Sequence, residues 1–209
     1  MTGHPIQDQQ EPMDKLQGNY KLILGSNSPR RVEYLKQMGL KFTQRVVSID
    51  ESYPQELKGH RIAEYLAKRK ADVQQNLLSE NEILLTSDTV VWCNGESLEK
   101  AINRDEAIDM LTKLSDKSHE VITAICLTTT NKQIIKHQTT SVWFNKLSKD
   151  QIAYYVDNFN PFDKAGAYGI QDWIGLIGIS KIEGSYSSVV GLPTSLLYST
   201  LKIMTTEMH

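Results

Sequence analysis

Short apolar runs alternate with segments of helical periodicity along most of the chain. Residues 20–25 form an apolar run that ends at a glycine, and residues 83–92 form the clearest run of this kind, so both predict buried strands. Ser28 and Pro29 predict the start of a helix, because serine is a favoured N-cap and proline is tolerated at the first helical position. Residues 42–48 predict a second strand after this helix.

Three further helices are indicated by periodicity and by capping patterns. In residues 61–78, apolar side chains recur near helical spacing and are expected to face the core, namely Ile62, Leu66, Val73 and Leu77. Asn103 is followed three residues later by Glu106, and Ser148 by Gln151, which are capping-box patterns at helix starts. The last of these helices is expected to run through Phe159.

The remaining pattern predicts mostly strands. Residues 121–129 and 134–144 predict a β-hairpin around Thr130, residues 173–182 predict a later strand, and a last helix is expected to begin near Pro193. Strands that alternate with helices indicate an α/β protein with parallel crossovers, and the hairpin adds antiparallel strands. The predicted fold is therefore a mixed β-sheet flanked by helices.

The length and the distribution of apolar residues narrow the class of protein. The 209 residues allow one large domain or two small ones. Residues 1–19 are polar and lack the apolar core of a signal peptide, so we interpret them as a flexible extension of a single domain, residues 20–209, and expect the protein in the cytoplasm. The longest apolar stretch, residues 173–179, is far shorter than the roughly 20 residues of a membrane-spanning helix, which excludes a membrane protein.

The charge balance is nearly neutral, with 23 Lys+Arg against 25 Asp+Glu and a net charge of -2. A protein that coats DNA or RNA needs a basic excess to neutralise phosphates, so nucleic acid is not an expected partner. A small basic pocket is still compatible with this balance. Cys93 and Cys126 lie in apolar, strand-like segments with no His or Cys at a zinc-ligand spacing, which predicts two buried free thiols.

The first candidate for chemistry is the strand–turn–helix junction at residues 25–31. The N-terminus of a helix offers free backbone N–H groups and a positive dipole end, both of which suit an anion. Ser26, Arg30 and Arg31 would add hydrogen bonds and charge for a phosphate. An ordinary capped helix with exposed arginines is the alternative interpretation, and the spacing alone does not separate the two.

Acidic residues form the second candidate. Asp88 lies inside an apolar strand, where a carboxylate is costly unless it has a partner, a metal or a catalytic role. At the end of its strand it would face the crevice where α/β sheets bind ligands, or it would simply cap a turn. Asp50 and Glu51 are of a type that binds Mg²⁺, although acidic loop residues are usually only solvated. Residues 68–70 are basic and equally suit a solvated helix face.

The third candidate is the glycine-rich segment of residues 163–171. Its small residues would let the backbone approach a ligand closely, while Lys164 and Gln171 supply polar groups. A turn between a helix and a strand explains the same composition about as well.

Taken together and in this order, these segments resemble the Maf family of nucleotide pyrophosphatases. The resemblance runs from about Leu22 to the C-terminal helix. It rests on five motifs: Ser-Asn-Ser-Pro-Arg-Arg (26–31), Ser-Asp-Thr-Val-Val (87–91), Ser-His-Glu-Val-Ile-Thr (118–123), Asp-Lys-Ala-Gly-Ala-Tyr-Gly-Ile-Gln (163–171) and Val-Val-Gly-Leu-Pro (189–193). The family implies a single Maf/ITPase-like α/β domain with an elongated mixed sheet and a central cleft.

The resemblance also implies an activity and a set of site residues. The activity is hydrolysis of a nucleoside triphosphate between its α and β phosphorus atoms, with a divalent cation, Mg²⁺ or Mn²⁺, as cofactor. Asp88 matches the base that takes a proton from water, and it would also bind the metal together with Glu51. Residues linked to substrate specificity are Arg30, Thr89 and Gln171. Residues expected to bind phosphates are Ser26, Arg31, Lys70, Lys100 and Lys164.

Gln171 favours the family branch that acts on dTTP and UTP. A glutamine amide both donates and accepts, so it can pair with the adjacent carbonyl and N–H of thymine or uracil. The alternatives are a pyrophosphatase for 7-methyl-GTP or another modified nucleotide, and a regulator of septum formation that binds nucleotide without turnover. The chain departs from the usual family pattern at Ser87, at Glu99 and Ala101 around Lys100, and at Asp172, which puts the substrate preference in question. A homodimer is a further expectation.

Overall fold

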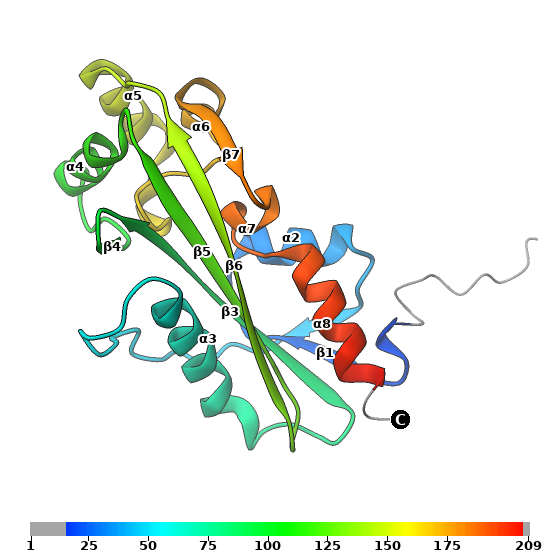
Figure 1. The fold of residues 1–209 in the computed structure, drawn as a ribbon. Helices are drawn as coiled ribbons and strands as arrows, with labels where there is room; N and C mark the ends of the chain where they lie inside the picture. Colours follow the sequence, from blue (N-terminus) through cyan, green and yellow to red (C-terminus); the bar gives the residue numbers. More distant parts are fainter. Residues whose placement is uncertain (1–15, 207–209) are drawn as a thin grey trace, which may run out of the picture.

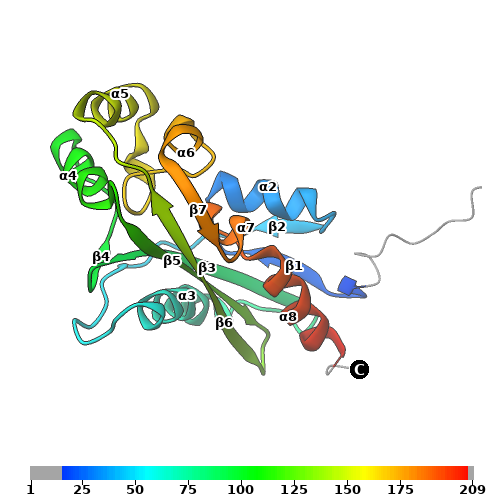
Figure 2. The same cartoon turned by 45° about the horizontal axis from the view of Figure 1, so that its top comes forward.

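The computed structural model describes residues 16–206 of the chain (Figures 1 and 2). The strands are β1 (Lys21–Leu24), β2 (Phe42–Gln44), β3 (Glu82–Cys93), β4 (Glu96–Leu98), β5 (Ser118–Thr128), β6 (Gln133–Phe144) and β7 (Ile179–Glu183). The helices are α2 (Pro29–Gln37), α3 (His60–Gln75), α4 (Arg104–Leu114), α5 (Lys149–Phe159), α6 (Trp173–Gly178), α7 (Tyr186–Val190) and α8 (Thr194–Thr206), with a 3-10 helix, η1 (Pro161–Asp163).

One mixed sheet connects all of these strands. Its order is β2-β1-β3-β5-β6-β7, and β4 pairs with β3 outside this path. The pairs of β1 with β2 and with β3 are parallel, whereas β3–β4, β3–β5, β5–β6 and β6–β7 are antiparallel. The long strands β5 and β6 form the predicted hairpin, and the mixed sheet flanked by helices is confirmed.

One edge of β3 has a gap in its strand pairing. Residues 82–85 of β3 pair with β1, and residues 91–93 pair with β4 on the same edge. Along the other edge, β3 pairs with β5 from Leu84 to Trp92 without interruption. Between β1 and β4, residues 86–90 therefore have a described strand neighbour on one side only. Asp88 lies in this stretch of β3, between the parts that pair with β1 and with β4.

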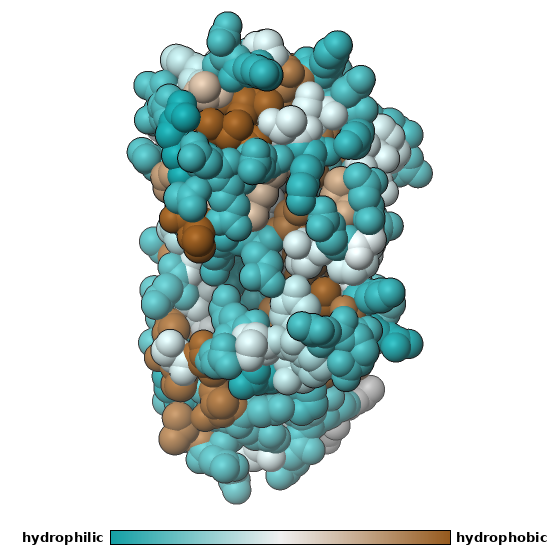
Figure 3. All heavy atoms as spheres, turned by 90° about the vertical axis from the view of Figure 1, so that its left-hand side faces the viewer, coloured by the Kyte–Doolittle hydropathy of each residue, from teal (hydrophilic) through white to brown (hydrophobic). Residues whose placement is uncertain are grey.

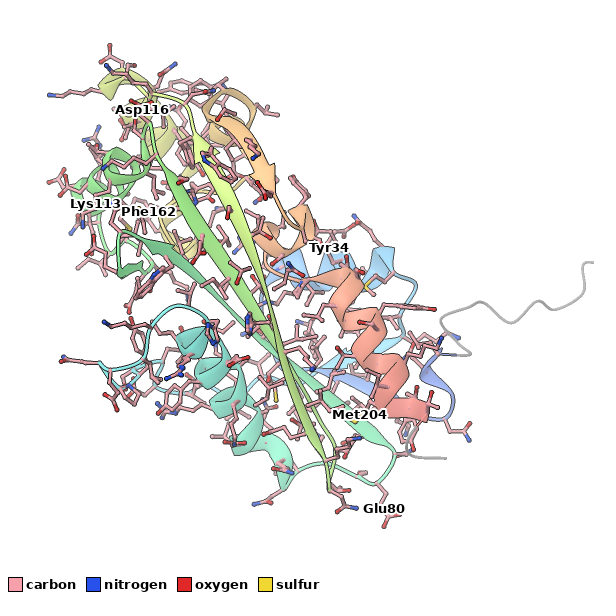
Figure 4. All side chains as sticks on the ribbon, in the orientation of Figure 1. Tyr34, Glu80, Lys113, Asp116, Phe162 and Met204 are labelled. Atoms are coloured by element: carbon pink, nitrogen blue, oxygen red, sulfur yellow. The ribbon has the colours of Figure 1, made fainter. Side chains whose placement is uncertain are left out.

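Helices cover both faces of the sheet because successive strand residues point to opposite faces. Leu22 and Leu24 of β1 pack in one cluster with residues of α2 and α8, including Met204, which Figure 4 labels. Ile23, between them, packs in a second cluster with α3. A third cluster joins α4 and α5 to the far end of β3, β5 and β6, with Phe162 packed against it (Figure 4). Figure 1 shows α3 and α8 on opposite sides of the long strands β3, β5 and β6.

The capping box predicted at Ser148 is complete, whereas the one predicted at Asn103 is only half formed, because the Glu106 carboxylate accepts from the N–H of Ile102 at 2.7 Å and not from that of Asn103. The Asn103 side chain accepts a hydrogen bond from the backbone N–H of Glu106 at 2.9 Å, at the start of α4. At the start of α5, Ser148 Oγ accepts from the N–H of Gln151 at 3.1 Å, and the glutamine side chain accepts from the N–H of Ser148 at 2.8 Å. These bonds satisfy backbone groups that a helix start otherwise leaves free.

Three details of the predicted pattern are wrong. Val73 and Leu77 are 49% and 56% exposed, because α3 packs through alanines such as Ala67 and Ala71, which allow a close approach to the sheet. The expected strand at residues 173–182 is the helix α6 followed by the short strand β7, since a short apolar run alone does not separate helix from strand. The strand expected at residues 42–48 ends at Gln44.

The predicted N-terminal extension lies mostly outside the described residues. Leu16 and Gln17 are described and buried, and the Gln17 amide exchanges hydrogen bonds with both backbone groups of Lys41, at 2.8 and 2.9 Å. Cys93 and Cys126 are buried free thiols, as predicted. Within residues 16–206, no helix combines the length and the apolar character needed to cross a membrane.

Candidate active site

A cavity of about 490 Å³ lies at the gap in the β3 edge. It is within the size range of small-molecule sites, about 300–1,000 Å³. The elements around it are the β1–α2 junction, the segment before α3, the middle of β3 and the segment after η1. Figure 3 shows the molecular surface hollowed at mid-height, with mainly hydrophilic side chains around the hollow. All ten residues predicted for the site line this cavity, namely Ser26, Arg30, Arg31, Glu51, Lys70, Asp88, Thr89, Lys100, Lys164 and Gln171.

Asp88 lies in the middle of β3, not at a strand end, and it does not cap a turn there. Its backbone pairs with Ala124 of β5, and its carboxylate Oδ1 accepts a hydrogen bond from Lys70 Nζ at 2.5 Å. Burial raises the pKa of the Asp88 carboxyl, while the positive charges of Lys70 and Arg31 oppose this rise. A carboxylate with a raised pKa is a stronger base than an exposed aspartate, which suits proton transfer near neutral pH.

Lys70 joins the two predicted acidic site residues. Its ammonium group lies 2.7 Å from Glu51 Oε1 and also contacts Asp88, and its side chain is only 15% exposed. The interpretation of residues 68–70 as a solvated helix face is thus wrong for Lys70. Partial burial favours the neutral acid at Glu51, but hydrogen bonds and charges from Lys70 and Lys100 outweigh it and hold the pKa of Glu51 below its ordinary value.

The two carboxylates are of the kind that a hard divalent cation such as Mg²⁺ takes as ligands. No group of three or more His, Cys, Asp or Glu side chains within residues 16–206 is arranged to hold a metal ion by itself. Mg²⁺ does not need such a group, because it is commonly bound by one or two carboxylates together with phosphates and water. Glu51 and Asp88 both line the cavity and share one ammonium neighbour, so they lie close enough together to serve in this way.

Arg31 points inward from the first turn of α2. Its guanidinium donates to Ser26 Oγ at 3.0 Å, to the carbonyl oxygen of Gly191 at 3.0 Å and to Thr89 Oγ1 at 3.4 Å. All three acceptors are neutral, so these bonds orient the guanidinium without cancelling its charge. Burial lowers the pKa of Arg31, but an arginine stays protonated in a protein. The alternative of exposed arginines on an ordinary helix is therefore wrong for Arg31.

The turn before α2 depends on a glycine and on a serine that does not cap the helix. Gly25 donates its N–H to the Leu85 carbonyl, and a Cβ at residue 25 would lie 2.8 Å from Thr86 Cγ2. Ser28 occupies the N-cap position, but its side chain makes no capping bond, and its N–H instead donates to Ser26 Oγ at 3.2 Å. Ser26 Oγ thus accepts hydrogen bonds both from Arg31 and from the backbone of the turn.

An ion-pair cluster connects the two sides of the cavity. Asp163 of η1 accepts hydrogen bonds from Arg30 of α2 at 2.8 Å and from Lys164 at 2.7 Å. Partial burial favours the neutral acid at Asp163, but Lys164 and Arg30 outweigh it and lower its pKa. The pairing brings residues 133 positions apart in the chain into contact.

The glycine-rich segment after η1 packs against β3 and β4, rather than serving as a simple connection. The N–H of Gly166 donates to the carbonyl oxygens of Leu98 and Glu99, and residues 100 and 165 form an isolated antiparallel bridge. Gly166 has a φ of +67°, and a Cβ there would lie 3.0 Å from Val91 Cγ1, so both the backbone conformation and the close packing favour glycine. Through these contacts the segment brings Lys164 and Gln171 to the cavity.

Several residues of the site were not predicted. Asp163 and Gly191 lie inside motifs quoted for the resemblance, but their partners Arg30 and Arg31 are distant in the chain, so no local pattern indicates these contacts. The hydroxyl of Thr123 is another such group. It lies 3.0 Å from the hydroxyl of Thr89 and donates a hydrogen bond to the carbonyl oxygen of Ser188 at 2.7 Å. That contact depends on the pairing of β3 with β5 and on the position of α7.

The fold and the cavity together define an α/β protein with a binding cleft at the centre of an elongated mixed sheet. The solved structure of the Staphylococcus aureus Ham1 protein has this fold: its TM-score is 0.52 at 15% identity, over 88% of this chain and 99% of that chain. Residues 21–204 match the model of the family described as Maf-like protein, and the chain belongs to this family.

Similar proteins from bacteria support the same assignment. A protein of Flavobacterium psychrophilum named dTTP/UTP pyrophosphatase is 52% identical over 180 residues, which cover 86% of this chain and 92% of that protein. A Bacteroides fragilis protein of the same name is 47% identical over 184 residues, which cover 88% and 95%. The resemblance and the fold class expected from the sequence are therefore confirmed.

Proposed function

We propose that this protein is a nucleoside triphosphate pyrophosphatase that hydrolyses dTTP and UTP to the monophosphate and pyrophosphate. The observation that carries the proposal is the contact of Lys70 with both Asp88 and Glu51, inside a cavity that also holds Arg31, Lys100 and further cations. A base next to several positive charges suits the attack of water on a polyphosphate. The names of the similar proteins support the same reaction.

Asp88 is the proposed general base. Lys70 occupies its Oδ1 atom, and Oδ2 accepts the proton of the attacking water. The water oxygen then forms a bond to the α phosphorus, the bond from that phosphorus to the α–β bridging oxygen breaks, and pyrophosphate leaves with the bridging oxygen. A positioned general base typically contributes about 10²–10⁴-fold to the rate of such a reaction.

The cations of the cavity bind the phosphates and stabilise the charge that develops on the leaving pyrophosphate. Arg31 is oriented by neutral acceptors and keeps its full charge for this purpose. Lys100 is only 3.5 Å from Glu51 and is 58% exposed, so it can reach a phosphate with little cost in desolvation. Arg30 and Lys164 are held by Asp163, which directly precedes the segment that carries Gln171.

A divalent cation, Mg²⁺ or Mn²⁺, is proposed at Glu51 and Asp88. When bound there, it would neutralise phosphate charge and polarise a phosphoryl oxygen. The nucleotide base is proposed to lie near Gln171, whose exposed amide can pair with thymine or uracil. The expected cytoplasmic location and the expected homodimer stay predictions.

A panel of nucleotides tests this proposal directly. Purified protein is incubated with Mg²⁺ or Mn²⁺ and with dTTP, UTP, dCTP, ITP or 7-methyl-GTP, and pyrophosphate release is measured. We expect dTTP and UTP to be hydrolysed fastest. Faster turnover of ITP or 7-methyl-GTP would contradict the proposed substrate class, and tight binding with no pyrophosphate release would support the regulator instead.

Asp88→Asn tests the assignment of the base. We expect kcat for dTTP to fall by about 10²–10⁴-fold, because the amide cannot take the proton of the water. Asp72→Asn is a matched control, since Asp72 is a half-exposed acid on α3 that pairs with Lys68 outside the cavity. Asp88→Asn protein that turns over dTTP as fast as the control would show that another group is the base.

A further inference from the structure

Asp172 directly follows Gln171 and uses its side chain in an unexpected way. It occupies the N-cap position of α6, where aspartate usually accepts a hydrogen bond from the helix backbone, but its side chain makes no capping bond. Instead, Asp172 Oδ2 accepts a hydrogen bond from the hydroxyl of Tyr155 at 2.7 Å. The carboxylate therefore serves a tertiary contact at the expense of a local one.

Tyr155 holds both ends of the turn that contains Gln171. This tyrosine lies on α5 and is fully buried. Its hydroxyl donates to Asp172 and accepts from the N–H of Gly169 at 3.0 Å, so one atom contacts the first and the last residue of the turn. The turn is closed by a hydrogen bond from the Asp172 N–H to the Gly169 carbonyl at 3.0 Å. Burial and the bond to Asp172 raise the pKa of Tyr155, which keeps the hydroxyl a donor.

The side chains of Gln171 and Asp172 both lie close to the backbone of Gly169. A Cβ added at Gly169 would lie 2.6 Å from Asp172 Oδ2 and 2.8 Å from Gln171 Nε2. The amide of Gln171 and the carboxylate of Asp172 thus lie against the same backbone atom. Asp172 Oδ2 is also 3.7 Å from Lys164 Nζ, so the same carboxylate contributes to the charge around a cation of the cavity.

We propose that Tyr155 and Asp172 are positioning residues that hold the turn of residues 169–172 and thereby orient Gln171 toward the base of the nucleotide. This inference rests on the proposed function, because it assigns the pair to the selectivity of that same site. Neither residue lines the cavity, so their effect on the substrate passes through Gln171 and Lys164.

The test is the ratio of kcat/KM for dTTP to kcat/KM for dCTP. Cytosine does not present the adjacent N–H and carbonyl with which thymine can pair with the Gln171 amide. This ratio therefore reports on the orientation of Gln171. We expect Tyr155→Phe and Asp172→Ala each to lower the ratio by roughly tenfold, the size of a lost hydrogen bond. We expect Asp172→Asn to keep the ratio near that of the wild type, because its amide oxygen can still accept from Tyr155.

Tyr154→Phe is the matched control. It makes the same chemical change on the neighbouring residue of α5, whose side chain is 51% exposed. The ratio is measured on one sample, so it does not depend on the fraction of a variant that is folded. The proposal is overturned if Tyr155→Phe or Asp172→Ala keeps the ratio within about twofold of this control, or if Asp172→Asn lowers it as much as Asp172→Ala.

A binding experiment separates this inference from the proposed function. If the wild-type protein released pyrophosphate from no nucleotide, the proposed function would fail. The positioning role would still be decided by the affinity ratio of α,β-methylene-dTTP to α,β-methylene-dCTP, measured by calorimetry on the same variants. A ratio that falls in Tyr155→Phe but not in Tyr154→Phe supports the inference, and equal ratios overturn it.

Discussion

His119 makes the stability of this protein depend on pH in a predictable way. It lies on β5, is 4% exposed and packs edge-on against Tyr168, with ring centroids 5.4 Å apart. Its Nε2 is 2.7 Å from the Tyr168 hydroxyl, whereas its buried Nδ1 has no hydrogen-bond partner in the described structure. Burial lowers the pKa of His119 from 6.5 to about 4. The imidazole is therefore neutral in the folded protein at neutral pH.

The size of the effect follows from this shift. Below pH 6.5 the unfolded chain binds a proton at residue 119 that the folded protein does not bind, so acid favours unfolding. The free energy of unfolding falls by about 1.4 kcal/mol per pH unit until the folded histidine also titrates, near pH 4. Over this window the lost stability amounts to about 3 kcal/mol, a large fraction of the 5–15 kcal/mol typical of a domain.

Urea unfolding of wild-type and His119→Gln protein between pH 7 and pH 4 measures this contribution. Ion-paired acids such as Glu51 and Asp163 titrate in both proteins and cancel in the difference. We expect the stability advantage of the wild type to shrink by about 3 kcal/mol toward pH 4. A difference between wild type and His119→Gln that stays constant across this range would refute the reasoning.

Two further predictions concern Ser87 of β3 and Gln171 in the turn of residues 169–172. Ser87 is fully buried, and its hydroxyl has no hydrogen-bond partner in the described structure. We therefore expect Ser87→Ala to raise the free energy of unfolding, measured by urea titration, by about 1 kcal/mol. A loss of stability would show that the hydroxyl does have a partner. Gln171→Glu removes the N–H donor of the amide, so we expect kcat/KM for dTTP to fall relative to kcat/KM for 7-methyl-GTP in the nucleotide panel. If the ratio of these two values did not change, Gln171 would not contact the base.

Much of the fold could be predicted because its signals are local. The N-cap bond of Asn103 and the capping box of Ser148 involve residues three positions apart, and both form in the structure. The hairpin around Thr130 depends on two adjacent apolar strands and a short turn. In contrast, residues 173–178 form a helix although they are as apolar as a strand, and Val73 is exposed although it fits a helical stripe. Which apolar residues become buried depends on what packs against them.

The sequence by itself determined the family and the residues that gather at the cleft, because five ordered motifs are specific even when each motif alone is weak. Only the tertiary structure decided what these residues contact. Lys70 is one of three consecutive basic residues, and the packing of α3 against β3 turns it, and not its neighbours, toward Asp88. Likewise, the position of α5 beside the segment after η1 places the Tyr155 hydroxyl at Asp172. Such contacts join residues that are distant in the chain, so they arise from packing and leave no local pattern in the sequence.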